Sequence, residues 1–165
     1  MVSIELLRRY PFFAGFSTKQ LTILANVGEE LLVDVGHYFF HEGDELGNFY
    51  MVVEGNVHIT VDIPDRKFKQ SLVQQLTNNL TMTEITVSIV GPGHTFGWSA
   101  LIPPNISTAN AKAGIASRLL GFDRKMLQSA IDKDCCFEHL LTLKAAQVVR
   151  QRLHDMRIET LAERV

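Results

Sequence analysis

GPGHTFGWSALIPPNISTANAKA, which runs from Gly91 to Ala113, is the most informative stretch of the sequence. Two glycines and a proline open it, Phe96 and Gly97 lead into a short apolar run, and Pro103-Pro104 ends that run. The pattern predicts a single helical turn that begins directly after a glycine. The first N–H groups of such a turn have no intrahelical acceptor, and the helix dipole favours negative charge beside them, so the turn is a candidate anion site. The alternative is an ordinary βαβ-type corner, with a glycine for backbone freedom and the prolines as a helix stop.

The part of this stretch from Phe96 onward resembles the phosphate-binding cassette of cyclic nucleotide-binding domains. This family includes the bacterial catabolite activator protein and the regulatory subunits of protein kinase A, and its cassette reads approximately F-G-E-x-A-L, a few loop residues, then P-R-[ST]-A-x-x-x-A. The matching residues are Phe96, Gly97, Ala100, Leu101, Thr108, Ala109 and Ala113. Upstream, HEGDELGNFYMVVEGNVHI resembles the family's E-G-D and F-Y-x-V-x-x-G-x-V segments. The likeness therefore covers most of the chain and implies a jelly-roll fold.

Two cassette positions depart from the family pattern. Trp98 stands where the family has the Glu that takes the ribose 2′-hydroxyl, and Ser107 stands where it has the Arg that pairs with the cyclic phosphate. Trp98 cannot accept a hydrogen bond, whereas Ser107 and Thr108 keep neutral hydroxyl donors. Losing both family side chains is expected to weaken binding by roughly 3–6 kcal/mol. We therefore expect cAMP and cGMP to bind weakly or not at all, and the native ligand to be a different small molecule that is anionic or has a flat group to stack on Trp98.

The candidate ligand-binding residues come from the cassette and from one helix. An ungapped carry-over of the family's long C-terminal helix puts its base-contacting positions near Arg152 and Leu153, so that Arg152 would return a positive charge to the pocket. The alternative, which we favour because most helical arginines are exposed, is a solvent-exposed Arg152. The full set of candidates is Phe96, Gly97, Trp98, Ser99, Ala100, Leu101, Ser107, Thr108 and Arg152.

The composition indicates one globular domain. The chain has 165 residues, of which 46% are hydrophobic and 21% are charged, and this is enough for a single buried core. The formal net charge of -2 argues against a broad basic surface for nucleic acid. No stretch approaches the length of a membrane span, and the N-terminus lacks a secretory apolar segment. We therefore expect a cytoplasmic protein without membrane contact.

The spacing of hydrophobic residues divides residues 1–165 into a helical cap (1–30), a jelly roll (31–122) and C-terminal helices (123–165). Ser17 and Gln20 form a capping box that predicts a helix start in the cap. Short alternating segments between glycines then predict a mainly β fold with flanking helices, closed as a jelly-roll barrel. The strand candidates are Leu31–Val35, Tyr38–Phe40, Phe49–Val53, Val57–Val61, Ile85–Val90 and Ile115–Phe122.

Residues 64–84 form a longer connection than the resemblance leads us to expect here, and we interpret them as an insertion. Leu72 and Leu76 lie at helical spacing within it. Its basic residues Arg66, Lys67 and Lys69 are either a docking patch or a solvated face, and a short run of charges is more often a solvated face.

The segment from Phe137 to about Arg164 contains no Gly or Pro and predicts one long helix. It carries two apolar stripes, of which one comprises Ala146, Val149, Leu153 and Met156, and the other Leu141, Ala145 and Val148. One interpretation packs a single broad face on the barrel. The interpretation we favour gives one stripe to the barrel and the first stripe to a partner subunit, as in the dimers of the family. A helix-turn-helix follows this helix in bacterial regulators of the family, and we expect this chain alone not to bind DNA.

Metal binding and catalysis have little support in the sequence. His37 and His41 are four residues apart and His58 lies on another strand candidate, but the H-x-H pair of cupin-type enzymes is absent, so we expect no bound metal. No G-x-S-x-G, P-loop or H-E-x-x-H motif is present. We predict a non-enzymatic, small-molecule-sensing regulatory module that needs no cofactor. The alternatives are the sensor half of a catabolite activator-type transcription regulator, a cupin-like metal-dependent enzyme, and a structural interaction module with an empty pocket.

Overall fold

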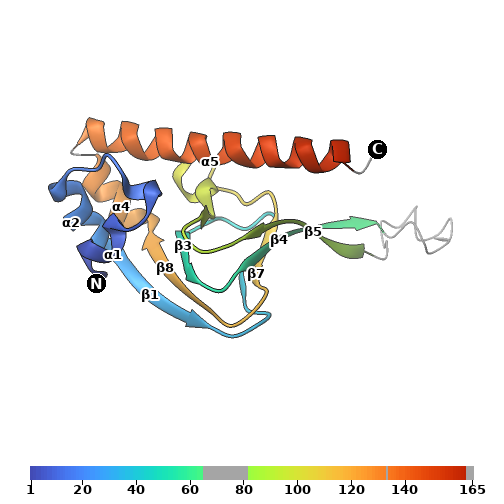
Figure 1. Ribbon diagram of the computed structural model, residues 1–165. Coiled ribbons are helices and arrows are strands. Elements are labelled where there is room, and N and C mark those ends of the chain that lie inside the picture. Colours follow the sequence, from blue (N-terminus) through green and yellow to red (C-terminus); the bar gives the residue numbers. More distant parts are fainter. Residues whose placement is uncertain (65–81, 133, 163–165) are drawn as a thin grey trace.

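Two antiparallel sheets form the body of the protein, and helices flank them (Figure 1). The computed structural model describes residues 1–64, 82–132 and 134–162. Within these residues the first sheet has the strand order β1-β8-β3-β6 and the second has the order β2-β7-β4-β5. Their bounds are β1 Gly28–Val33, β2 Tyr38–Phe40, β3 Asn48–Glu54, β4 Val57–Pro64, β5 Met82–Val90, β6 Thr95–Phe96, β7 Asn110–Ala113 and β8 Ser117–Asp123. This is the mainly β jelly-roll fold with flanking helices that the sequence predicts.

Most strands differ by a few residues from the sequence-based bounds, and β8 begins at Ser117 and ends at Asp123 rather than spanning Ile115–Phe122. β1 begins at Gly28 rather than Leu31, because its first residues already pair with Phe122 and Gly121 of β8, so the helical cap ends before residue 30. The two-residue strand β6 and the strand β7 were not among the candidates. The alternation along Val57–Val61 holds, since Ile59 and Val61 line the same cavity, and the shift in register between Ile59 and Thr60 comes from the extra residue Val87 on β5.

The N-terminal cap consists of α1 (Ile4–Arg8), the 3₁₀ turn η1 (Pro11–Phe13) and α2 (Thr18–Val27). The capping box is confirmed: the Gln20 N–H donates to Ser17 Oγ at 3.3 Å, and the Ser17 N–H donates to Gln20 Oε1 at 2.9 Å. These two bonds satisfy backbone donors that have no intrahelical acceptor at the start of α2. The cap helices gather at one end of the barrel together with α4 (Arg124–Ile131) (Figure 1).

Aromatic rings join the cap, the barrel and the C-terminal helix α5 (Cys135–Ala162). The Phe49 and Phe122 rings stack with centroids 4.8 Å apart between β3 and β8. Phe13 of the cap packs against Phe122 with centroids 5.9 Å apart, and Phe16 meets Phe137 of α5 edge to face at the same distance. Because aromatic pairs of this kind bury large apolar areas, they fix both flanking helical regions on one hydrophobic core.

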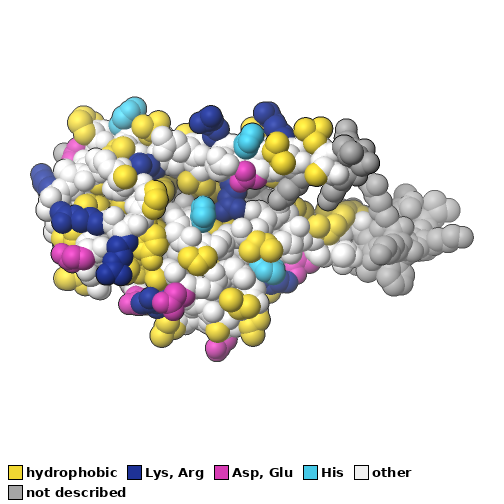
Figure 2. Space-filling model, in the orientation of Figure 1, with side chains coloured by type: hydrophobic (Ala, Val, Ile, Leu, Met, Phe, Trp, Pro, Cys, Tyr) yellow, Lys and Arg dark blue, Asp and Glu magenta, His cyan; other side chains and the backbone are white. Residues whose placement is uncertain are grey.

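Helix α5 runs from beside the cap along the length of the barrel (Figure 1). Leu141 and Ala145 are buried, and Val148 is half-buried, so this stripe faces the body of the protein. On the other stripe Leu153 and Met156 are each 48% exposed. In the space-filling view, hydrophobic side chains lie between basic and histidine side chains along the top of the molecule, where α5 runs (Figure 2).

The connection between β4 and β5 lies mostly outside the described residues. β4 and β5 stay paired as far as Pro64 and Met82, beyond the strand bounds expected from the sequence. The predicted helical spacing of Leu72 and Leu76 and the basic run at Arg66, Lys67 and Lys69 fall on residues 65–81, outside the described part. Among the helices that the structure describes, none combines the length and the apolar character needed to cross a bilayer.

Candidate ligand-binding site

The cassette begins with a left-handed glycine. Gly97 has φ 71° and precedes the 3₁₀ turn η2 (Trp98–Leu101), whose first bond runs from the Ala100 N–H to Gly97 O at 3.0 Å. The N–H groups of Trp98 and Ser99 precede that bond, so they have no acceptor within the turn. A Cβ on residue 97 would lie 3.2 Å from the backbone oxygen of Asn48. The helical turn predicted after a glycine is therefore confirmed, and glycine is required there by conformation and by space.

A side chain that the sequence analysis did not single out holds the end of this turn. Asn105 has φ 65°, and its Nδ2 donates to the carbonyl oxygens of Ser99 at 3.1 Å and Ala100 at 3.0 Å. Arg124, the first residue of α4, donates from Nη1 to Asn105 Oδ1 at 2.8 Å and from Nη2 to Glu45 Oε1 at 2.6 Å. An asparagine directly after two prolines is a signal for a left-handed residue and would have identified this position. The cassette is thus tied to α4 by side chains.

Ser107 does not keep the free hydroxyl donor that we expected. Its side chain is buried, and Oγ donates to the Ala109 carbonyl oxygen at 2.6 Å while accepting from the Ala109 N–H at 3.4 Å. In this arrangement the single hydroxyl proton of Ser107 is used within its own turn rather than offered to the cavity. Thr108 is exposed, so its hydroxyl is accessible to a ligand.

A cavity of about 400 Å³ lies beside the cassette. Seven of the predicted residues line it, namely Phe96, Gly97, Trp98, Ser99, Ser107, Thr108 and Arg152. Ala100 and Leu101 do not line it, because Ala100 is buried in the core and Leu101 packs against that core. The other lining residues come from the sheets, the loops at Leu46 and Ala109, and α5: Phe40, Leu46, Ile59, Val61, Val87, Ser88, Thr95, Ala109 and Met156. The cavity is thus mainly apolar, with hydroxyl groups and one guanidinium.

The guanidinium of Arg152 is the charged group of this cavity. Arg152 is half-buried rather than solvent-exposed, so the alternative that we favoured from the sequence is wrong. Its Nη1 donates to Ser88 Oγ on β5. Burial lowers the pKa of Arg152, and the charge of Asp155 partly opposes that change. The side chain nevertheless stays protonated at neutral pH, since an arginine is not deprotonated in proteins.

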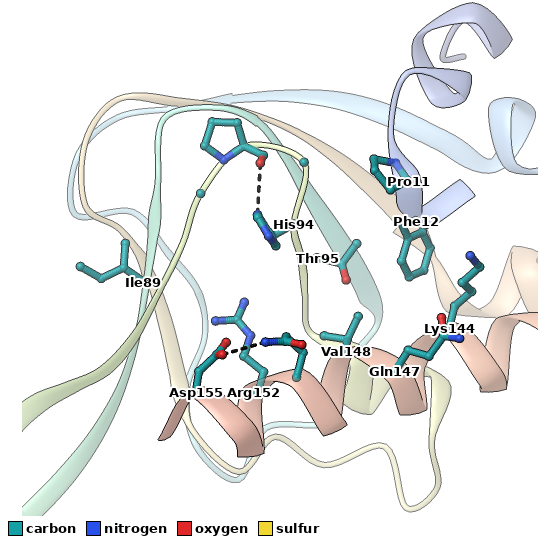
Figure 3. A pocket seen from close by; sticks show the side chains of 14 residues that line it. Pro11, Phe12, Ile89, His94, Thr95, Lys144, Gln147, Val148, Arg152 and Asp155 are labelled. Carbon is teal, nitrogen blue, oxygen red and sulfur yellow. Dashed lines mark hydrogen bonds between the residues drawn. The ribbon is translucent and has the colours of Figure 1, made fainter. Parts of the chain in front are cut away.

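Arg152 also borders a second, larger depression of about 770 Å³ on the outside of the barrel (Figure 3). It lies between α5, the β5–β6 turn and the N-terminal cap, with His94, Phe12 and Lys144 among its lining residues. Asp155 faces this groove and accepts a hydrogen bond from Gln151 Nε2 at 2.8 Å. His94 is exposed here, with Nδ1 3.2 Å from the Pro92 carbonyl oxygen.

The histidines do not assemble into a metal centre in the part of the chain that the structure describes. His41 stacks on Tyr38 with centroids 4.5 Å apart, and His37 meets Phe39 edge to face at 5.2 Å. No group of three His, Cys, Asp or Glu side chains among these described residues lies close enough together to hold one metal ion. Cys135 and Cys136 are free and exposed at the start of α5.

Comparison with known proteins gives a consistent family. The profile of the cyclic nucleotide-binding domain matches residues 31–134. A solved structure of a candidate cyclic nucleotide-binding protein from Geobacter metallireducens GS-15 has a TM-score of 0.74 and 29% identity, and the match covers 93% of this chain and 100% of that one. A cyclic nucleotide-binding domain from Methylobacillus flagellatus KT has a TM-score of 0.73 and 16% identity, with 97% and 81% covered.

Regulatory proteins have the same fold. The sensor domain of the transcriptional regulator DNR from Pseudomonas aeruginosa has a TM-score of 0.63 and 20% identity, and the match covers 91% of this chain and 90% of that one. No curated protein sequence matches the chain. The profile spans more than half of the residues, and it includes the whole cassette and most of the barrel. The chain therefore belongs to the cyclic nucleotide-binding domain family, with a fold similar to the sensor domains of catabolite activator-type transcription regulators.

Proposed function

We propose that this chain is a non-enzymatic sensing module that binds a small anionic molecule and holds cyclic nucleotides weakly or not at all. The observation that carries the proposal is the state of the two departing cassette positions. Trp98 has an indole where an acceptor for the ribose hydroxyl is expected, and the Ser107 hydroxyl is used by Ala109. Neither side chain is therefore free to hold a sugar phosphate.

The energetic consequence follows from the kind of bond that is lost. Hydrogen bonds to charged groups are worth about 1.5–3 kcal/mol each, and two of them are missing. The N–H groups of Trp98 and Ser99 remain as neutral donors. Two to four powers of ten in affinity are thus expected to be lost relative to a family member with both side chains.

Calorimetry with cAMP and cGMP tests the proposal. We expect no binding below the micromolar range, since the cassette itself keeps only neutral donors and the charged group of the cavity, Arg152, comes from α5. The double variant Trp98→Glu with Ser107→Arg is the matched control, and it should bind cAMP at least about tenfold more tightly than the natural chain. Submicromolar binding of either nucleotide to the natural chain would falsify the proposal.

A second candidate function is the sensor part of a transcription regulator. It is supported by the fold shared with the N-terminal domain of a transcriptional regulator from Streptomyces coelicolor A3(2), which has a TM-score of 0.62 and 24% identity and is covered over 94% of its length. Whether the gene reads on past Val165 into a DNA-binding segment tests this candidate.

We also propose that two chains associate through α5. Leu153 and Met156 are each 48% exposed, in a stripe whose spacing is that of a short coiled-coil seam. Ala146 is exposed and Val149 half-buried on the same stripe. A partner helix would remove these apolar groups from water, which is the main driving force for such association.

A further inference from the structure

We infer that the cavity beside the cassette takes an aromatic carboxylate, with the carboxylate on Arg152 and the ring against Trp98. The inference rests on the proposed function and names the chemical class of its ligand. In this site the anion is bound by Arg152 of α5, which Ser88 of β5 holds, and not by Ser107 of the cassette, whose hydroxyl is bonded to Ala109.

The first argument is that Arg152 is half-buried and is hydrogen-bonded to no carboxylate among the described residues. Three arginines in the described part of the chain are half-buried, namely Arg118, Arg124 and Arg152. Arg118 donates to Glu30 at 2.9 Å and to Glu54 at 2.5 Å, and Arg124 donates to Glu45 at 2.6 Å. Arg152 has a neutral hydroxyl, that of Ser88, as its hydrogen-bond partner. Asp155 acts on Arg152 through its charge and is hydrogen-bonded to Gln151 instead. A half-buried guanidinium without a hydrogen-bonded carboxylate is costly unless a ligand supplies that group.

The second argument is the chemistry of the cavity walls. None of the described residues that line the cavity is an Asp or a Glu, so no side-chain carboxylate is available for the hydroxyl groups of a sugar. The walls include aromatic rings at Phe40, Phe96 and Trp98. A planar guanidinium pairs with a carboxylate through two parallel hydrogen bonds. Apolar walls favour contact with an aromatic ring over contact with the hydroxyl groups of a ribose. An apolar body with one carboxylate matches both features.

The third argument decides between the cavity and the outer groove, since Arg152 borders both. Figure 3 shows Arg152 in the groove. Asp155 lies in the groove and would repel an anion there. Ser88, which holds the guanidinium, lines the cavity and not the groove. The charge of Arg152 is therefore satisfied better by a ligand on the cavity side.

Trp98 is the single tryptophan of the chain, so its fluorescence reports on this cavity alone. The probe pair is 3-phenylpropanoate and its neutral amide, 3-phenylpropanamide, which have nearly the same shape and do not absorb at the red edge of indole absorption. We expect the acid to change Trp98 emission saturably and to bind at least about tenfold more tightly than the amide, with the same dissociation constant by calorimetry.

Variants locate the charge that distinguishes the two probes. Arg152→Met keeps an unbranched apolar stem and removes the charge, so it should reduce the preference for the acid to less than about threefold. Lys144→Met is the matched control, because Lys144 lines the groove but not the cavity, and it should leave both affinities unchanged. Equal melting temperatures of the two variants would confirm that they are folded.

Each outcome bears on the inference. Equal affinity for acid and amide in the natural chain overturns it without any variant, as does loss of binding in Lys144→Met but not in Arg152→Met. Failure of both probes to bind also overturns it. Titration of cAMP and cGMP into the same protein separates this failure from that of the proposed function, which fails if a nucleotide binds submicromolar.

Discussion

At Gly97 the backbone adopts a conformation that other residues reach only with strain, and the cassette depends on it. The left-handed φ of 71° turns the chain from β6 into η2, whose first two residues, Trp98 and Ser99, line the cavity. Asn105 then fixes the far end of the turn through its bonds to two carbonyl oxygens. The shape of the turn at Trp98–Leu101 therefore depends on two single residues, Gly97 at its start and Asn105 at its end.

Gly97→Ala is expected to destabilise the protein by about 1–2 kcal/mol, because an L side chain is strained at this φ. The added Cβ would also press on the Asn48 carbonyl oxygen at 3.2 Å. This corresponds to a melting temperature lower by roughly 2–8 °C. Thermal unfolding followed by circular dichroism measures it.

Gly47→Ala provides the comparison for this variant. Gly47 has no neighbouring atom within 4 Å of an added Cβ and does not adopt a left-handed φ, so its substitution should change stability by less than about 0.5 kcal/mol. A Gly97→Ala protein as stable as Gly47→Ala would show that the turn tolerates a side chain.

At the scale of elements, α5 has two apolar stripes with different surroundings. Leu141 and Ala145 are nearly inaccessible, at 2% and 1% exposed, whereas Leu153 and Met156 keep about half of their surface in water. The sequence predicted the helix and its two stripes. It could not decide which way Arg152 points, because that depends on how α5 is rotated against β5.

Leu153→Glu is expected to convert a dimer into monomers, because a charge would lose its hydration in an apolar seam. Sedimentation at micromolar concentration measures the mass. His154→Glu introduces the same charge at the next residue of α5, which is also exposed but lies outside the stripe, and it should leave the dimer intact. A natural chain that sediments as a monomer would rule out the proposed interface.

At the scale of the whole molecule, the sequence predicts the barrel well because alternation and glycine spacing reflect which faces are buried. It misses β6 and β7, since Thr95–Phe96 is too short for a period and Asn110–Ala113 consists of small or polar residues. The cassette could be located because Gly97 and its neighbours follow a pattern. The hydrogen bond from Ser107 to Ala109 could not be predicted from the sequence, because a hydroxyl has several possible local acceptors and only the structure distinguishes them.

The arrangement of ionisable groups over the described residues leads to a prediction about metals. His37, His41 and His58 have no further His, Cys, Asp or Glu side chains grouped with them as ligands in that part of the chain. We expect purified protein to have no stoichiometric zinc, iron or manganese by elemental analysis, and a chelator not to shift its melting temperature. One tightly held metal ion per chain would instead support the cupin-like alternative.

Adjacent residues of α5 face in two directions: Arg152 toward the cavity and Leu153 toward solvent. A carboxylate that takes hydrogen bonds from Arg152 has to share them with Ser88 of β5, so occupancy of the cavity and the seating of α5 on the barrel are thermodynamically linked. Linkage is reciprocal: if the ligand changes the equilibrium constant for the position of α5 by some factor, a change in that position alters the affinity for the ligand by the same factor. A titration of ligand affinity against protein concentration would therefore measure the same free energy as a titration of self-association against ligand.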